Sequence, residues 1–171
     1  MDPLPFLDRT IKTPDGTTYE RLSPPITDFR QCHGVVPLER RILYRCRRLP
    51  PSSDTTPHED QENEQFILKI KVQIPDPTTD TAYTSSDATT HELRALQTFN
   101  SAGTSCTYAP RLIAFASQSQ PQRPESLLPG GYISCTIMTT LPGKSLFDLG
   151  YWSLEEDDRV EIREGFLEAL R

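Results

Sequence analysis

The sequence predicts an α+β fold in which a twisted antiparallel sheet of about five strands packs against one helix. Three observations support this prediction. Residues 66–72 alternate in the manner of a strand, residues 87–103 lie between helix start and stop signals, and two more strand-like runs occupy residues 109–118 and 130–140. The spacing of the last two runs is typical of an antiparallel hairpin, which favours an α+β arrangement over a parallel one.

Length and composition set the limits of the fold. The chain has 171 residues and 35% hydrophobic residues, which is enough for one domain with a modest core, and 16 prolines and 8 glycines predict many loops. The net charge of -6 argues against nucleic acid and anionic lipid as main partners. No apolar run approaches the roughly 20 residues of a membrane span. The opening "MDPLPFLDRT" lacks the features of a signal peptide, so we expect a cytoplasmic protein.

The cysteines do not form a recognisable metal or redox motif. Cys32, Cys46, Cys106 and Cys135 are widely separated, without a C-x-x-C pair or a histidine at zinc-finger spacing. We interpret them as reduced and structural, with metal or disulfide use as the less favoured alternative. No metal ligand is assigned.

The first 60 residues are predicted to form an N-terminal extension that includes the first strands. Residues 11–22 are typical of a hairpin because Pro14, Asp15 and Gly16 favour a turn. A proline-containing link over residues 22–29 and a strand around Ile42 to Cys46 follow. The polar, acidic residues 50–65 are predicted to be a mobile surface loop.

The strand over residues 66–72 has two unlike faces. Period two places Phe66, Leu68, Ile70 and Val72 on one wholly apolar face. Ile67, Lys69 and Lys71 share the other face, which in the simplest interpretation is a solvated surface. In the helix that follows, which has its start signal at Ser86 or Asp87, Glu92 lies four residues before Leu96. The carboxylate is therefore expected at the border of the buried stripe.

Residues 154–171 predict a second helix. Ser153 and Glu156 match a capping box, and apolar residues recur at helical spacing, so the helix needs a surface to pack against. Because the sequence stops at Arg171 without a C-cap, we expect that a further layer covering this helix is missing. The predicted division is residues 1–60, residues 61–150 as a small lobe, and residues 151–171 as the start of a large-lobe helix.

The succession "ILKI", "HELRAL", "PRLIAF" and "GGYISCTIMTTLPGKSL" resembles the small lobe of the protein-kinase-like superfamily. It looks most like the aminoglycoside and choline phosphotransferase branch and the fungal kinase-like proteins near it. The resemblance covers about residues 66–171, and "IMTTLPGKSL" is similar to the hinge between the two lobes of those enzymes. It implies an ATP-dependent phosphotransferase fold.

The resemblance assigns roles to five residues. Lys69 matches the strand lysine that contacts the α- and β-phosphates of ATP, and Glu92 matches the helix carboxylate that pairs with it. Met138 would line the back of the adenine pocket, and the backbones of Thr139 and Leu141 would bind adenine. Lys71 is interpreted as solvated.

The sequence also departs from the family pattern. Only Gly34 stands where a Gly-rich loop is expected, and residues after 150 contain no catalytic or magnesium-binding aspartate motif. The chain alone is therefore predicted not to be catalytic, and the resemblance implies a large lobe in cis or in trans. Two alternatives stay open: a pseudokinase-like relic that binds a protein partner or self-associates through residues 154–171, and an unrelated α+β interaction domain.

Overall fold

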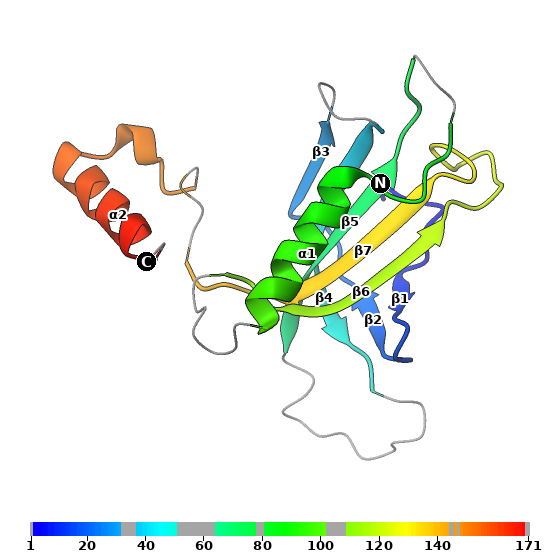
Figure 1. Ribbon diagram of the computed structural model, residues 1–171, viewed down its shortest axis with the longest axis horizontal. Helices are drawn as coiled ribbons and strands as arrows, with labels where there is room; N and C mark the ends of the chain where they lie inside the picture. The colour runs from blue at the N-terminus through cyan, green and yellow to red at the C-terminus, as the bar shows by residue number, and fades with distance from the viewer. Residues whose placement is uncertain are drawn as a thin grey trace.

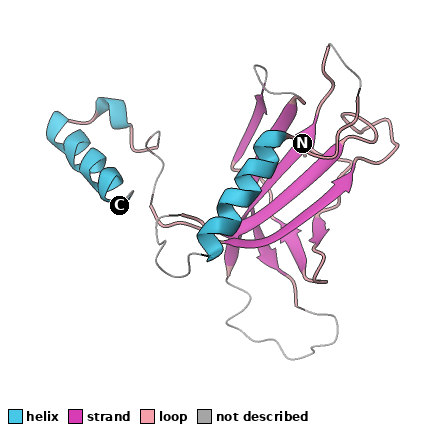
Figure 2. Ribbon diagram, in the orientation of Figure 1, coloured by secondary structure: helices cyan, strands magenta, loops and turns pink. Residues whose placement is uncertain are grey.

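The computed structural model describes residues 2–31, 37–50, 64–77, 81–101, 109–143, 146 and 148–169. Within these residues the α+β class is confirmed, with seven strands where about five were predicted, and two α-helices (Figures 1 and 2). The strands are β1 Thr10–Lys12, β2 Thr18–Arg21, β3 Thr27–Gln31, β4 Glu39–Arg48, β5 Gln65–Gln73, β6 Leu112–Ser119 and β7 Tyr132–Thr139. The helices are α1 Asp87–Ser101 and α2 Glu156–Ala169, and a short 3-10 helix spans Tyr151–Ser153.

All strand pairs in the sheet are antiparallel. The order is β1-β2-β4-β5-β7-β6, with β3 also pairing with β4, and the sheet curls into a nearly closed barrel. The predicted hairpin of the last two strands is confirmed, because β6 pairs directly with β7. The lysine-bearing strand β5 lies between β4 and β7, in the middle of the sheet.

The prediction of a link over residues 22–29 was wrong for its second half, because β3 begins at Thr27. The Leu22 N–H donates to the Arg45 carbonyl at 2.8 Å, and the Ile26 N–H donates to the Leu43 carbonyl at 2.7 Å. β2 and β3 therefore pair one after the other along β4, with an interruption at residues 23–25. Pro24 and Pro25 lack the N–H that pairing with β4 requires. The pairing is therefore broken only around these two residues and resumes in β3.

The predicted hairpin near the N-terminus is confirmed. β1 pairs with β2, and Gly16 takes a φ of 87°, a value that glycine adopts without a steric penalty. The Asp15 carboxylate accepts a hydrogen bond from the Thr17 N–H at 3.1 Å, which closes the turn.

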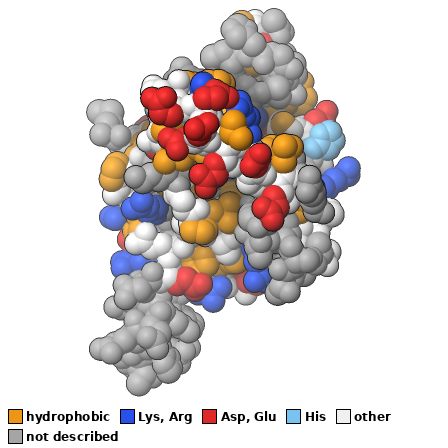
Figure 3. Space-filling model, turned by 90° about the vertical axis from the view of Figure 1, so that its left-hand side faces the viewer, with side chains coloured by type: hydrophobic (Ala, Val, Ile, Leu, Met, Phe, Trp, Pro, Cys, Tyr) orange, Lys and Arg blue, Asp and Glu red, His pale blue; other side chains and the backbone are white. Residues whose placement is uncertain are grey.

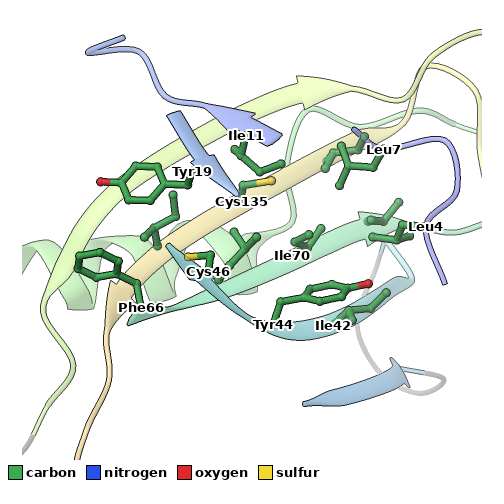
Figure 4. Close-up of a cluster of buried hydrophobic side chains, with 14 of the residues drawn as sticks. Leu4, Leu7, Ile11, Tyr19, Ile42, Tyr44, Cys46, Phe66, Ile70 and Cys135 are labelled. Atoms are coloured by element: carbon green, nitrogen blue, oxygen red, sulfur yellow. The ribbon is translucent and has the colours of Figure 1, made fainter. Parts of the chain in front are cut away.

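The hydrophobic core fills the inside of the curled sheet (Figure 4). β5 contributes the apolar face that the sequence predicts, from Phe66 to Val72, and β7 contributes Ile133, Cys135 and Ile137. Cys46 and Cys135 are free thiols in this core, and burial raises the pKa of each to about 12, which suits a structural role. Cys32 and Cys106 lie outside the described residues.

The N-terminal segment completes the core. Leu4, Phe6 and Leu7 are buried and belong to the same cluster as the strand residues. The sequence did not predict this contribution, because a short proline-containing segment has no periodicity that indicates burial. The acidic segment predicted as a mobile loop falls mostly on residues 51–63, outside the described residues.

The two helices differ in their surroundings. α1 covers the outer face of the sheet, whereas α2 lies apart from the sheet in Figure 1. α2 begins at Glu156, so the prediction of Ser153 as its capping residue was wrong: Ser153 ends the preceding 3-10 helix. Among the described residues, no helix has the length and apolar content to cross a membrane.

Candidate functional site

The candidate site lies between α1 and the outer face of the sheet. The side chains that point outward come from β4, β5 and β7, and their Cα partners form rows across these strands. One row contains Arg41, Lys71 and Ser134, and the next contains Leu43, Lys69 and Thr136. Two lysines two residues apart on β5 therefore face the same helix.

Lys69 and Glu92 form the ion pair that the family resemblance implies. The Lys69 Nζ lies 2.5 Å from the Glu92 Oε1, and both side chains keep partial contact with solvent. Glu92 sits in the second turn of α1, above the middle of β5, as its position at the border of the buried stripe predicted. The role of the pair in binding a nucleotide stays a prediction.

The interpretation of Lys71 as solvated was wrong. Its side chain is only 4% exposed, against 21% for Lys69. The Lys71 Nζ lies 2.6 Å from the Glu92 Oε2 and donates to the Thr89 hydroxyl at 3.1 Å. Period two identified the face correctly, but α1 crosses nearer to Lys71 than to Lys69, and a covered ammonium group must find partners.

Glu39 is a buried carboxylate that the sequence analysis missed. It is fully buried, and it accepts hydrogen bonds from Tyr132 at 2.6 Å, Ser86 at 3.0 Å and Arg41 at 2.7 Å. Its Oε1 lies 3.9 Å from the Lys71 Nζ. A signal was available: the alternation in β4 places Glu39 and Arg41 on one face, opposite to Ile42 and Tyr44. Arg45 and Arg47 share that face and are exposed, so the pattern marks Glu39 as outward-facing but does not by itself predict its burial.

The start of α1 is fixed by the same polar layer. The predicted start signal is confirmed, because the Ser86 hydroxyl accepts a hydrogen bond from the Thr89 N–H at 3.1 Å. Ser86 also donates to Glu39, so the helix cap is bonded to β4. The predicted stop at Gly103 lies outside the described residues.

Both carboxylates are ionised near neutral pH. Burial raises the pKa of Glu92, but hydrogen bonds from Lys69 and Lys71 lower it more, and the net pKa lies below the ordinary value of 4.5. Burial likewise raises the pKa of Glu39, while hydrogen bonds from Tyr132 and Arg41 and the charge of Lys71 give a net decrease. Burial and the neighbouring Glu39 raise the pKa of Tyr132, which stays neutral and donates.

The charges of this layer favour an anionic ligand. Arg41, Lys69 and Lys71 carry three positive charges, and Glu39 and Glu92 carry two negative ones. Solvent reaches two of these cations, Arg41, which is 27% exposed, and Lys69, which is 21% exposed and contacts Glu92. An ammonium group has three donors, so Lys69 retains capacity for a phosphate.

The hinge residues of the prediction lie at the end of β7. Met138 is buried on the same face as Lys69, and Ile67 is its Cα partner on β5, so an apolar surface adjoins the ammonium group. The Thr139 N–H donates to the Arg111 carbonyl at 3.0 Å and is therefore engaged within the protein. Leu141 follows the strand and is partly exposed. Gly34 lies outside the described residues.

Two hollows among the described residues lie elsewhere. One of about 470 Å³ is lined by residues that include Asp2, Arg21 and Tyr44, and one of about 390 Å³ lies beside the loop after β2. Neither is lined by Lys69 or Glu92. In the part of the chain that the structure describes, no cluster of His, Cys, Asp and Glu side chains could hold a metal ion.

Comparisons with known proteins give no further assignment. No family model, curated protein or solved structure matches this chain.

Proposed function

We propose that this chain is the nucleotide-binding small lobe of a protein-kinase-like phosphotransferase, in which Lys69 contacts the phosphates of ATP. The observation that carries the proposal is the 2.5 Å contact between the Lys69 Nζ and the Glu92 Oε1. In kinases, a lysine on a central strand contacts the phosphates only while a carboxylate from the adjacent helix holds it. The order of strand, helix, strand and strand in this chain supports the same assignment.

The charge of Lys69 and the apolar side chains beside it give further support. Lys69 is the most accessible ammonium of a layer with one excess positive charge, and a point charge on a rigid strand suits phosphate binding. Ile67 and Met138 are Cα partners on the same face, so apolar side chains adjoin the ammonium group. A bound ATP would supply the phosphoryl group, whereas the chain's own residues bind and orient it.

We propose that this chain binds ATP but does not itself transfer the phosphoryl group. Phosphoryl transfer also needs a residue that orients the acceptor and ligands for magnesium. The sequence contains no counterpart of those motifs, and the family resemblance assigns them to the large lobe.

Titration with magnesium-ATP tests the proposal. We expect ATP to raise the Tm of the wild-type chain, because a ligand that binds the native state stabilises it by mass action. Lys69→Ala should lose this shift. Lys12→Ala is the matched control, because Lys12 is an exposed lysine on β1 and the variant should keep the shift. An equal shift in the wild type and in Lys69→Ala, or none in the wild type, would contradict the proposal.

The second candidate function is a protein-binding or regulatory module. The observation in its favour is the exposure of large apolar side chains after β7: Trp152 is 85% exposed, and Phe166 and Leu167 are more than half exposed. Figure 3 faces this side of the molecule and shows acidic and hydrophobic side chains together. Exposed apolar side chains of this size are available to a partner surface if they lie in one patch.

Sedimentation velocity over a wide concentration range tests this second candidate for the case of self-association. We expect the wild type to associate as the concentration rises, and Trp152→Ser and Phe166→Ser to remain monomeric. A wild-type chain that stays monomeric throughout would count against docking of a second copy.

A further inference from the structure

The Glu92 carboxylate is held by two ammonium groups. Its Oε1 lies 2.5 Å from the Lys69 Nζ, and its Oε2 lies 2.6 Å from the Lys71 Nζ. A carboxylate with a single partner can rotate about its terminal bond and along its chain. With a partner on each oxygen, the orientation of the group is fixed, and so is the direction from which Lys69 is held.

Lys71 is itself fixed by the protein. Its Nζ has two acceptors within hydrogen-bond distance, the Glu92 Oε2 at 2.6 Å and the Thr89 hydroxyl at 3.1 Å, and the charge of the Glu39 Oε1 lies 3.9 Å away. Its side chain is 4% exposed. Lys71 therefore lacks the exposure to contact a ligand, and any influence on a bound nucleotide must pass through another residue.

The contacts of Lys71 join the helix to the sheet. Thr89 lies one turn before Glu92 on α1, and Glu39 lies on β4. Glu39 is held in turn by Tyr132 on β7 and by Ser86 at the helix cap. Contacts through Lys71 therefore connect Glu92 to β4, β5 and β7 and to the first turn of α1.

We propose that Lys71 is a positioning residue, which fixes Glu92 so that Glu92 holds Lys69 in the orientation that receives a phosphate. The inference rests on the proposed function for its effect on nucleotide binding, but the arrangement of Lys71, Glu92 and Lys69 is independent of any ligand. A supporting residue of this kind arranges the binding group before the ligand arrives.

The test compares Lys71→Met with the wild type in two measurements. The first is the Kd for magnesium-ATP by calorimetry. Loss of an outer residue that orients a metal ligand reduces metal affinity by about ten- to a hundredfold, and by analogy we expect a Kd at least about tenfold higher in Lys71→Met. Lys69→Met should lose binding, and Lys12→Met should match the wild type.

The second measurement needs no nucleotide. Competitive acetylation, followed by mass spectrometry, gives the reactivity of Lys69 relative to the exposed Lys12 in the same molecule. If Lys71 fixes Glu92, its removal releases Lys69, whose relative reactivity rises several-fold. Thr89→Val removes one contact of Lys71 but keeps both ammonium charges, so a rise in Lys69 reactivity in this variant as well separates positioning from charge.

The outcomes are distinguishable. If the wild type binds ATP, a Kd for Lys71→Met within about twofold of the wild type, with unchanged Lys69 reactivity, overturns the inference. If the wild type does not bind ATP, the proposed function fails, and the reactivity of Lys69 alone decides the positioning role. If Lys71→Met does not fold, Thr89→Val replaces it: this variant removes one contact of Lys71 but keeps both lysines, and unchanged reactivity then overturns the inference.

Discussion

The two faces of β5 are both covered, but they are made of opposite chemistry. Phe66, Leu68, Ile70 and Val72 point into the curled sheet, among the apolar and aromatic side chains of the core. Lys69 and Lys71 point outward beneath α1, where the neighbours are carboxylates and hydroxyls. One strand thus separates a hydrophobic core from an ionic layer.

This difference assigns different tasks to the two faces. Burial of apolar area is the main source of folding stability, about 25 cal/mol for each Å². Buried ion pairs contribute little net stability, because desolvation offsets their attraction, but loss of one partner is strongly destabilising. The inner face therefore holds the sheet together, whereas the outer face determines where Glu92 and Lys69 lie.

The largest loss of stability is expected for a substitution on the inner, apolar face of β5. Leu68→Ala should lower the free energy of unfolding by about 2–5 kcal/mol, because it leaves a cavity in a closely packed core. Urea denaturation measures the change. Leu167→Ala, the same substitution at an exposed site on α2, should change stability by less than about 0.5 kcal/mol. Equal losses in the two variants would show that the described core is wrong.

Glu39→Gln tests the outer face and should have a smaller effect. The variant keeps the size of the side chain but removes the negative charge that faces Arg41 and Lys71, so we expect a loss of about 1–3 kcal/mol. Glu125→Gln, at an exposed position, is the matched control and should be nearly neutral in the same urea experiment. A neutral Glu39→Gln would mean that the layer adds nothing to stability.

Low pH should reduce the stability that the ionic layer on the outer face contributes. The pKa values of Glu39 and Glu92 are lowered in the folded protein. Their contribution to stability is therefore complete above the ordinary value of 4.5 and is lost as the pH falls through the lower folded values. Urea midpoints of the wild type should decrease over this range, and those of Glu39→Gln should decrease less. Parallel curves for the two proteins would contradict the assignment for Glu39.

Lys71→Met should have the smallest effect on stability. Methionine keeps most of the aliphatic volume. Glu92 is 30% exposed, so water can solvate its freed oxygen, and Glu39 keeps its hydrogen bonds from Arg41, Ser86 and Tyr132; we therefore expect a change below about 1.5 kcal/mol. The same variant is expected to change ligand binding and Lys69 reactivity strongly. A large loss of stability would instead place Lys71 with the core residues and would erase the contrast between the two faces.

Much of the site could be anticipated from the sequence. Local periodicity identified both faces of β5, and the helix start at Ser86 followed from capping chemistry. Family resemblance brought Lys69 and Glu92 together, and the structure has them in contact. Lys71 was misplaced because periodicity states which face a residue shares, but not how much of that face a helix covers.

The sequence by itself determined the α+β class, the apolar face of the central strand, the hairpins at residues 11–22 and 112–139, and the start of α1. These features depend on residues near one another in the chain, so local patterns are sufficient to predict them. Only the tertiary structure decided that Leu4 and Phe6 enter the core, that β3 extends the sheet edge, and that Glu39 meets Lys71. Those contacts join distant segments, and their energies depend on what covers each side chain, which no local pattern contains.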